Sequence, residues 1–256
     1  MLNFHQKKFL NPSHGIGYDW SQTGANGPSI YPTTSIGARV RFLHKGNIVM
    51  QFAVLDGIPG DTSNPNGTRI ILNETDGLLV AGTIYHLHGE SLLELPDNNY
   101  AETFEHTGMG FWYYTDKYSH IVSNIVNWGL YFVFEQDVFL EENSSQGLSI
   151  FGRFGVADDK FNDVDYFIAL GGVYKGLISG RDNDFVGLAL ANAHNTFEFR
   201  TINNFDNREL NVELFYRFNV SDFLDIQVDI QNFLLADNSR LKSNELLLGM
   251  RMILSF

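Results

Sequence analysis

Two stretches near the C-terminus alternate strictly between large apolar side chains and other, mostly polar ones. In residues 209–218 and 224–231, every second side chain is large and apolar, and most of those between are charged or carry an amide. The final stretch, LLLGMRMILSF at 246–256, repeats the apolar half of this pattern up to Phe256. A period of two places alternate side chains on opposite faces of a β-strand. These stretches therefore predict strands with one apolar face and one polar face.

Weaker alternation runs back through the rest of the chain. With the three stretches above it predicts eleven strands, the others being at 37–44, 48–55, 78–87, 108–115, 127–139, 147–156, 164–175 and 185–193. Residues 13–20 are a candidate for a twelfth. The one helical pattern is a weak one in SHIVSNIV at 119–126. We therefore predict an all-β fold in one domain spanning 1–256, with no firm assignment for 1–26.

Composition supports this prediction and excludes several classes of protein. The 22 Phe and 11 Tyr residues favour strands. The absence of cysteine excludes disulfides and thiolate metal sites, and a formal charge of -13 argues against a nucleic-acid partner. No apolar run is long enough for a membrane helix, whereas a membrane β-strand needs only about 9–11 alternating residues. The start, MLNFHQKKFL, lacks the apolar core of a secretory signal.

The alternation fits two architectures. In a soluble β-sandwich the apolar face forms the core, whereas in an antiparallel transmembrane β-barrel it meets lipid and the polar face lines a water-filled lumen. Counted back from the C-terminus, the connections are mostly long and short in turn, as in outer-membrane barrels, although 88–107 breaks the rule. The connections favour the barrel.

Aromatic residues fall where a barrel needs them. Outer-membrane barrels carry aromatic girdles at both water interfaces. If the last strand runs toward the periplasm, the periplasmic strand ends carry Phe139, Phe185, Phe218, Phe223 and Phe256, and the extracellular ends carry Trp112, Tyr114 and Trp128. A terminal aromatic after alternating apolar residues also resembles the signal by which the barrel-assembly machinery recognises outer-membrane proteins.

Three regions resemble the carbohydrate-selective porins, the OprB-type sugar porins. They are GPSIYPTTSIGARVRF at 27–42 with QFAVLDGIPGDTSNPNGTRIIL at 51–72 and DGLLVAGTIYH at 76–86, then residues 147–192, and then ELNVELFYRFNVSDFLDIQVDIQNFL at 209–234. The resemblance implies a porin of the bacterial outer membrane, surrounded by its lipids, that passes small neutral sugars by passive diffusion. It implies no catalysis and no cofactor, and it allows a homo-oligomer for which the sequence indicates no interface. Family barrels of about sixteen strands imply that this chain is the C-terminal two thirds.

A porin selects solutes by the size, polarity and charge of its lumen. Because a charge at the lipid midplane costs about 2–4 kcal/mol, we expect the charged face of each strand to point inward. The predicted pore-lining residues are Arg153, Asp165, Lys175, Glu209, Asn211, Glu213, Arg217, Asp225, Gln227, Asp229, Gln231, Glu245 and Arg251. Phe151, Phe167 and Phe215 are the candidates for stacking on a sugar, and the loops at 21–35 and 56–77 are candidates for narrowing the passage.

Two other interpretations stay open. One is a soluble all-β domain that binds or hydrolyses carbohydrate, with Asp225 and Asp229, or Glu209 and Glu213, as paired carboxylates. The other is a porin fragment without activity. His86 and His88 share a strand face but have no third ligand, so we predict no metal site.

Overall fold

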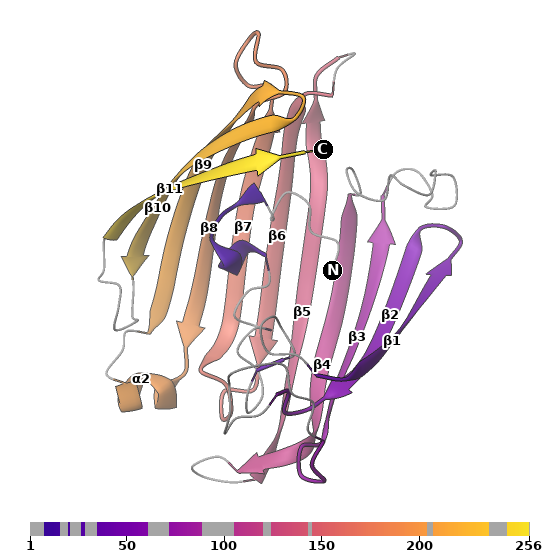
Figure 1. Ribbon diagram of the computed structural model, residues 1–256. Helices are drawn as coiled ribbons and strands as arrows, with labels where there is room; N and C mark the ends of the chain where they lie inside the picture. The colour runs from indigo at the N-terminus through magenta and orange to yellow at the C-terminus, as the bar shows by residue number, and fades with distance from the viewer. Residues whose placement is uncertain are drawn as a thin grey trace.

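The computed structural model describes residues 8–15, 20, 27–28, 35–60, 72–88, 105–119, 124–142, 145–203, 207–235 and 245–255. Within them, eleven β-strands form one curved sheet in which each strand lies beside its neighbours in chain order (Figure 1). The strands are β1 (Gly37–His44), β2 (Ile48–Asp56), β3 (Leu78–Leu87), β4 (His106–Ser119), β5 (Asn124–Leu140), β6 (Gly147–Ala157), β7 (Val164–Lys175), β8 (Phe185–Asn195), β9 (Arg208–Ser221), β10 (Leu224–Leu235) and β11 (Glu245–Leu254). All ten pairings are antiparallel. The predicted all-β fold and its eleven strands are confirmed.

The two faces of the sheet differ as the alternation predicts. On β8, Ala189, Ala191 and Ala193 are buried, whereas Leu188 and Leu190, which alternate with them, are exposed. We call the face with the buried side chains the inner face and the opposite one the outer face. The outer face stays apolar to the last strand, where the side chain of Met250 is 77% exposed. The side chains of the inner face are therefore buried, whereas the apolar side chains of the outer face are exposed.

Segments of the same chain cover the inner face. Residues 8–15, which include the 3-10 helix η2 (Pro12–His14), lie in front of β7 and β8 in Figure 1. Trp20, Ile58 and Phe161 pack against the inner side chains of the other half of the sheet. This cover explains why inner side chains are buried although the sheet is one layer thick.

The two edges of the sheet are β1 and β11. Among the described residues, β1 pairs only with β2, and β11 pairs only with β10. Because every neighbouring pair is antiparallel, the first and eleventh strands run in the same direction. They are therefore unable to close the sheet by antiparallel pairing with each other.

Three local features differ from the sequence predictions. The candidate strand at 13–20 is wrong where it is described, because Asn11 caps a 3-10 turn by accepting a hydrogen bond from the Ser13 amide at 3.0 Å. The helical pattern at 119–126 is wrong where it is described, because Ser119 ends β4 and Asn124 begins β5. The helix α2 (Phe197–Asn203) is absent from the sequence predictions, because its 7 residues are too few to show a helical periodicity. In the part of the chain that the structure describes, no helix is long and apolar enough to span a bilayer.

Candidate functional site

A cluster of buried polar side chains occupies the inner face over β9, β10 and β11. Asn211, Glu213, Gln227 and Asp229 are each at most 2% exposed. Arg251 reaches them from the edge strand and donates from Nη2 to Oε1 of Gln227 at 2.7 Å. We call these five residues the polar cluster. Carboxylate, amide and guanidinium groups thus lie together on adjoining strands.

An ion pair lies on the same face near the β9–β10 turn. The Arg217 guanidinium donates from Nε to Oδ2 of Asp225 at 2.8 Å, and its Nη2 contacts the same oxygen. Asn219 donates from Nδ2 to the other oxygen, Oδ1, at 2.9 Å. The opposite charges balance, so this end of the inner face has no single dominant sign.

The remaining predicted pore-lining residues divide into inner-face residues and peripheral ones. Arg153 is 1% exposed on the inner side of β6. Gln231 lies in register between Glu213 and Leu247, and it donates from Nε2 to Oδ1 of Asp229 at 2.9 Å. Glu209 and Glu245 pair in register with the buried inner residues Ala193 and Phe233.

Two of the predicted residues lie apart from the cluster. Lys175 ends β7 and donates from Nζ to Oγ of Ser145 in the neighbouring connection at 2.8 Å. Asp165 lies at a register shift of β7, where its Oδ1 is 2.6 Å from Nδ1 of His194. The His194 ring stacks on the exposed ring of Tyr166. Asp165 therefore belongs to a local contact at the strand end.

The three candidate stacking rings are all buried. Phe151 and Phe215 are each 1% exposed beneath Phe9, whose ring centroid is 5.5 Å and 4.9 Å from theirs, respectively. Phe167 is fully buried against Ala169 and other small side chains of β7 and β8. A solute gains access to Phe151 or Phe215 only when Phe9 moves. That any of the three candidate rings stacks on a sugar stays a prediction.

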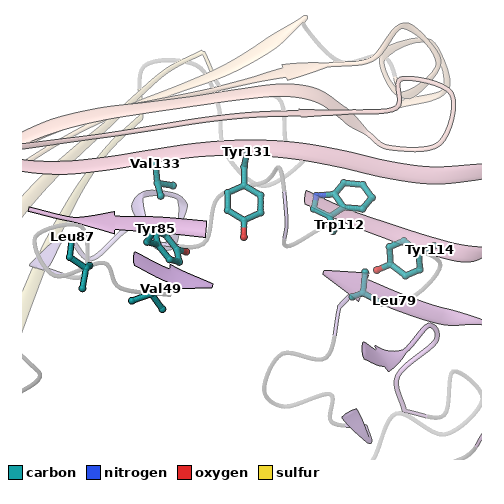
Figure 2. Packing of buried hydrophobic residues seen from close by; sticks show 8 residues of the cluster. All are labelled: Val49, Leu79, Tyr85, Leu87, Trp112, Tyr114, Tyr131 and Val133. Atoms are coloured by element: carbon teal, nitrogen blue, oxygen red, sulfur yellow. The ribbon is translucent and has the colours of Figure 1, made fainter. Parts of the chain in front are cut away.

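The inner face over β2 to β5 carries a cluster of aromatic and aliphatic side chains. Figure 2 shows the cluster there, which comes from four neighbouring strands and consists of Val49, Leu79, Tyr85, Leu87, Trp112, Tyr114, Tyr131 and Val133. The Tyr131 hydroxyl lies 2.6 Å from Oγ1 of Thr83, also on this face. Polar side chains lie among them on the same half of the inner face, since His106, Asn127 and Glu135 are buried there.

Three of the predicted interface aromatics lie on the inner face, so their assignment to a lipid-facing girdle is corrected. Trp112 and Tyr114 are at most 1% exposed within the aromatic cluster. Phe185 packs beneath the Lys8 ammonium, which lies 4.6 Å from its ring centroid. Those that are exposed are Trp128, Phe139, Phe218 and Phe223, and Phe256 lies outside the described residues. For these five, a place at the membrane interface stays a prediction.

His14 adds a titratable group to the polar cluster from outside the sheet. Its side chain is fully buried, and its Nε2 lies 3.6 Å from Oε2 of Glu213. Burial lowers the pKa of His14 to about 4, because the charged imidazolium loses its hydration. At neutral pH the contact is therefore between a neutral imidazole and the carboxyl group rather than an ion pair.

A family model described as "Carbohydrate-selective porin, OprB family" matches residues 3–256. The chain belongs to the OprB family. Porins are channels, so the family is not one of enzymes. Membership agrees with the single antiparallel sheet and with the alternation of its two faces.

Relatives of known name support the family assignment. Porin B of Pseudomonas aeruginosa is 23% identical over 254 residues, which cover 84% of this chain and 54% of that protein. A structure titled "High pH structure of Pseudomonas putida OprB" has a TM-score of 0.66 at 19% identity and covers 88% of this chain and 60% of that one. Its "Low pH" counterpart has a TM-score of 0.57 at 23% identity and covers 86% and 55%. The fold is thus that of OprB, and the chain spans about half the length of the relatives it matches.

Sequence reasoning missed the part that residues 8–15 play in this OprB-family sheet. No periodicity marks them, and their significance depends on partners more than a hundred residues away along the chain. The predicted narrowing loops at 21–35 and 56–77 lie largely outside the described residues. In their described parts, Ser35 donates to Asp56 and Ile58 packs on the aromatic cluster.

Proposed function

We propose that this chain forms a large part of the wall of an outer-membrane pore through which small neutral sugars diffuse passively. The observation that carries the proposal is the apolar outer face, which is continuous across the sheet. Its exposed side chains include Phe42, Phe52, Met109, Leu130, Phe154, Leu170, Leu188, Leu214, Val228, Leu248 and Met252. In water a surface of this extent favours association, whereas in a bilayer it is the normal outer surface of a barrel. The outer face therefore argues against a soluble all-β domain.

The chemistry of the inner face supports a neutral, hydroxyl-rich solute. Sugar hydroxyls donate and accept hydrogen bonds, and the polar cluster offers a carboxylate in Glu213, an amide in Gln227 and a guanidinium in Arg251. The Arg217–Asp225 pair keeps the charge balanced at one end. An anion or a cation would meet repulsion from one partner of each pair, whereas a neutral sugar would meet none.

Closure of the pore requires strands beyond these eleven. An open edge in lipid leaves unsatisfied backbone groups, so a membrane sheet closes on itself. Since β1 and β11 run in the same direction, antiparallel closure takes an odd number of further strands. In this proposal β11 also carries the signal for the barrel-assembly machinery.

The test is a flux measurement on protein purified from outer membranes. We expect a heat-modifiable band on gels, and liposomes containing the protein are expected to swell in isotonic glucose. A protein that stays soluble without detergent, or liposomes that never swell, would contradict the proposal.

A further inference from the structure

Residues 8–15 are bound to the inner face by hydrogen bonds to the polar cluster, and we call them the inner strap. Both oxygens of the Glu213 carboxylate accept hydrogen bonds from strap amides, that of Leu10 at 2.6 Å and that of Asn11 at 2.9 Å. Gln227 Nε2 and Arg251 Nη2 both donate to the carbonyl oxygen of Lys8, at 2.9 Å and 2.6 Å. Four hydrogen bonds from three strands thus hold one short stretch of backbone.

The strap is also fixed at its far end and by an aromatic contact. Arg153 donates from Nη1 to the carbonyl oxygen of Gly15 at 2.7 Å. Phe9, which is 4% exposed, meets Phe151 and Phe215 edge to face. The strap therefore covers the inner face from β6 to β11.

The groups that hold the strap are of the chemical kinds that can also hydrogen-bond sugar hydroxyls. Two neighbouring hydroxyls can donate to the Glu213 carboxylate as the two amides do, and a sugar oxygen can accept from Gln227 and Arg251 as the Lys8 carbonyl does. The rings of Phe151 and Phe215 would then face the apolar side of the pyranose. Because the strap fills this space, it and a sugar exclude each other.

The strap provides hydrogen-bond partners for only some of the buried polar atoms of the polar cluster. Within the described part of the chain, Nε of Arg251 and Oδ2 of Asp229 are buried and make no hydrogen bond. A buried polar atom without a hydrogen-bond partner destabilises the docked state, because it has lost its hydration without compensation. A peptide backbone has its donors and acceptors in fixed positions, whereas hydroxyls rotate to donate or accept. A hydroxyl-rich ligand therefore suits these two atoms better than the strap does.

We propose that the inner strap is a built-in competitor of the solute, which occupies a sugar-binding site on the inner face and is displaced when sugar enters. The site consists of Glu213, Gln227 and Arg251 with the rings of Phe151 and Phe215. This inference rests on the proposed function and adds a site and a means of regulation to it. Because the strap is tethered, it competes at a constant effective concentration. Sugar therefore occupies the site only when its external concentration is high enough to displace the strap.

A reversible cross-link tests the competition directly. A Cβ added at Gly249 would lie 2.9 Å from Cδ1 of Leu10, so we choose the pair Leu10→Cys with Gly249→Cys. The sequence has no cysteine, so the two new thiols are the only ones in it. In liposomes, glucose flux through the oxidised protein should be lower than through the reduced protein by about fivefold or more. In each single-cysteine variant, the glucose flux should be the same with and without reductant.

A second variant loosens the strap without any cross-link. Phe9→Ala removes the ring that packs between Phe151 and Phe215, and it should raise the glucose flux by about fivefold. The matched control is Phe154→Ala, which removes an equal ring from the exposed outer side of β6 and should leave the flux unchanged.

The outcomes separate this inference from the proposed function. Equal glucose flux in the oxidised, reduced and Phe9→Ala proteins would overturn the strap as a competitor and leave the porin function standing. Absence of flux in every protein, including reduced and Phe9→Ala, would overturn the porin function and the competition with it. Lower flux on oxidation together with higher flux in Phe9→Ala supports both.

Discussion

Phe9 and Phe215 meet edge to face on the inner side of the sheet, with ring centroids 4.9 Å apart. The two rings come from opposite ends of the chain, one from the inner strap and one from β9. Edge-to-face pairs of this kind add about 0.5–1.5 kcal/mol to what burial alone supplies. The contact therefore links docking of the N-terminal part to the strand that carries Glu213.

Lowering the pH should loosen the strap through His14. Burial lowers the pKa of His14 to about 4, whereas an exposed histidine has a pKa of about 6.5. Between these values the released strap binds more protons than the docked one, so docking weakens as the pH falls from about 6.5 to about 4. Asn211 and Asp229 raise the pKa of His14 and so oppose this effect in part, and the Glu213 carboxyl group also faces the imidazole.

The measurement is the rate at which a thiol reagent modifies Leu10→Cys as the pH falls. The rate is divided by that of Lys160→Cys, an exposed position whose thiol corrects for the chemistry of the reagent. We expect the ratio to rise below about pH 6, and we expect His14→Gln to remove the rise. A rise that persists in His14→Gln would assign it to another group.

Two adjacent glycines on β7 should differ in how well they tolerate replacement by alanine. A Cβ at Gly171 would lie 2.4 Å from Cζ of Phe151 and 2.8 Å from Cβ of Ala189, whereas a Cβ at Gly172 has its nearest neighbour, the Ser149 carbonyl oxygen, at 3.4 Å. Overpacking costs about 1–3 kcal/mol, so Gly171→Ala should lower the free energy of unfolding by that amount. Gly172→Ala should change it by less than about 0.5 kcal/mol. The temperature at which the heat-modifiable band shifts measures both, and equal shifts would contradict the packing of Phe151 on Gly171.

The strands could be predicted from sequence because each one carries its own period of two. The face of an aromatic side chain could not be predicted where the period fails. Residues 111–114 read FWYY, so both faces of β4 are aromatic, and Trp112 and Tyr114 point inward while Phe111 and Tyr113 point outward. The polar cluster was predictable because β9 and β10 alternate strictly, but its occupant was not. Contacts of Phe9 and Leu10 depend on how the chain returns across the sheet, and no local pattern encodes that.

Asp184 should stabilise the β7–β8 connection far more than its neighbour Asp182. It accepts hydrogen bonds from Nε of Arg181 at 2.7 Å, from the Tyr216 hydroxyl at 2.6 Å and from the Asn219 amide at 2.9 Å. Burial alone would raise the pKa of Asp184, but these donors outweigh it, so the pKa lies below its ordinary value. Its contribution is present above pH 4 or so and is lost as the pH falls through the lowered pKa.

Replacement by asparagine measures this contribution. Hydrogen bonds to a charged group are worth about 1.5–3 kcal/mol, so Asp184→Asn should lower the midpoint of thermal unfolding at pH 7 clearly. Asp182→Asn, in the same connection and exposed, should leave the midpoint within error. If the two variants unfold alike, the hydrogen bonds of Asp184 contribute little.

A charge placed on the outer face should be costly only if that face meets lipid. Leu188, in the middle of β8, and Leu177, in the connection before it, are almost equally exposed at 56% and 55%. In water, lysine at either position would be accepted with little effect. In a bilayer, a lysine near the midplane costs about 2–4 kcal/mol and one near the interface about 0–1 kcal/mol. We therefore expect Leu188→Lys to reduce the amount of heat-modifiable protein in outer membranes strongly and Leu177→Lys to reduce it little. The two positions are matched in exposure. Equal yields of the two variants would therefore mean that the outer face of β8 faces water. The pore proposed here would then lack its lipid-facing wall.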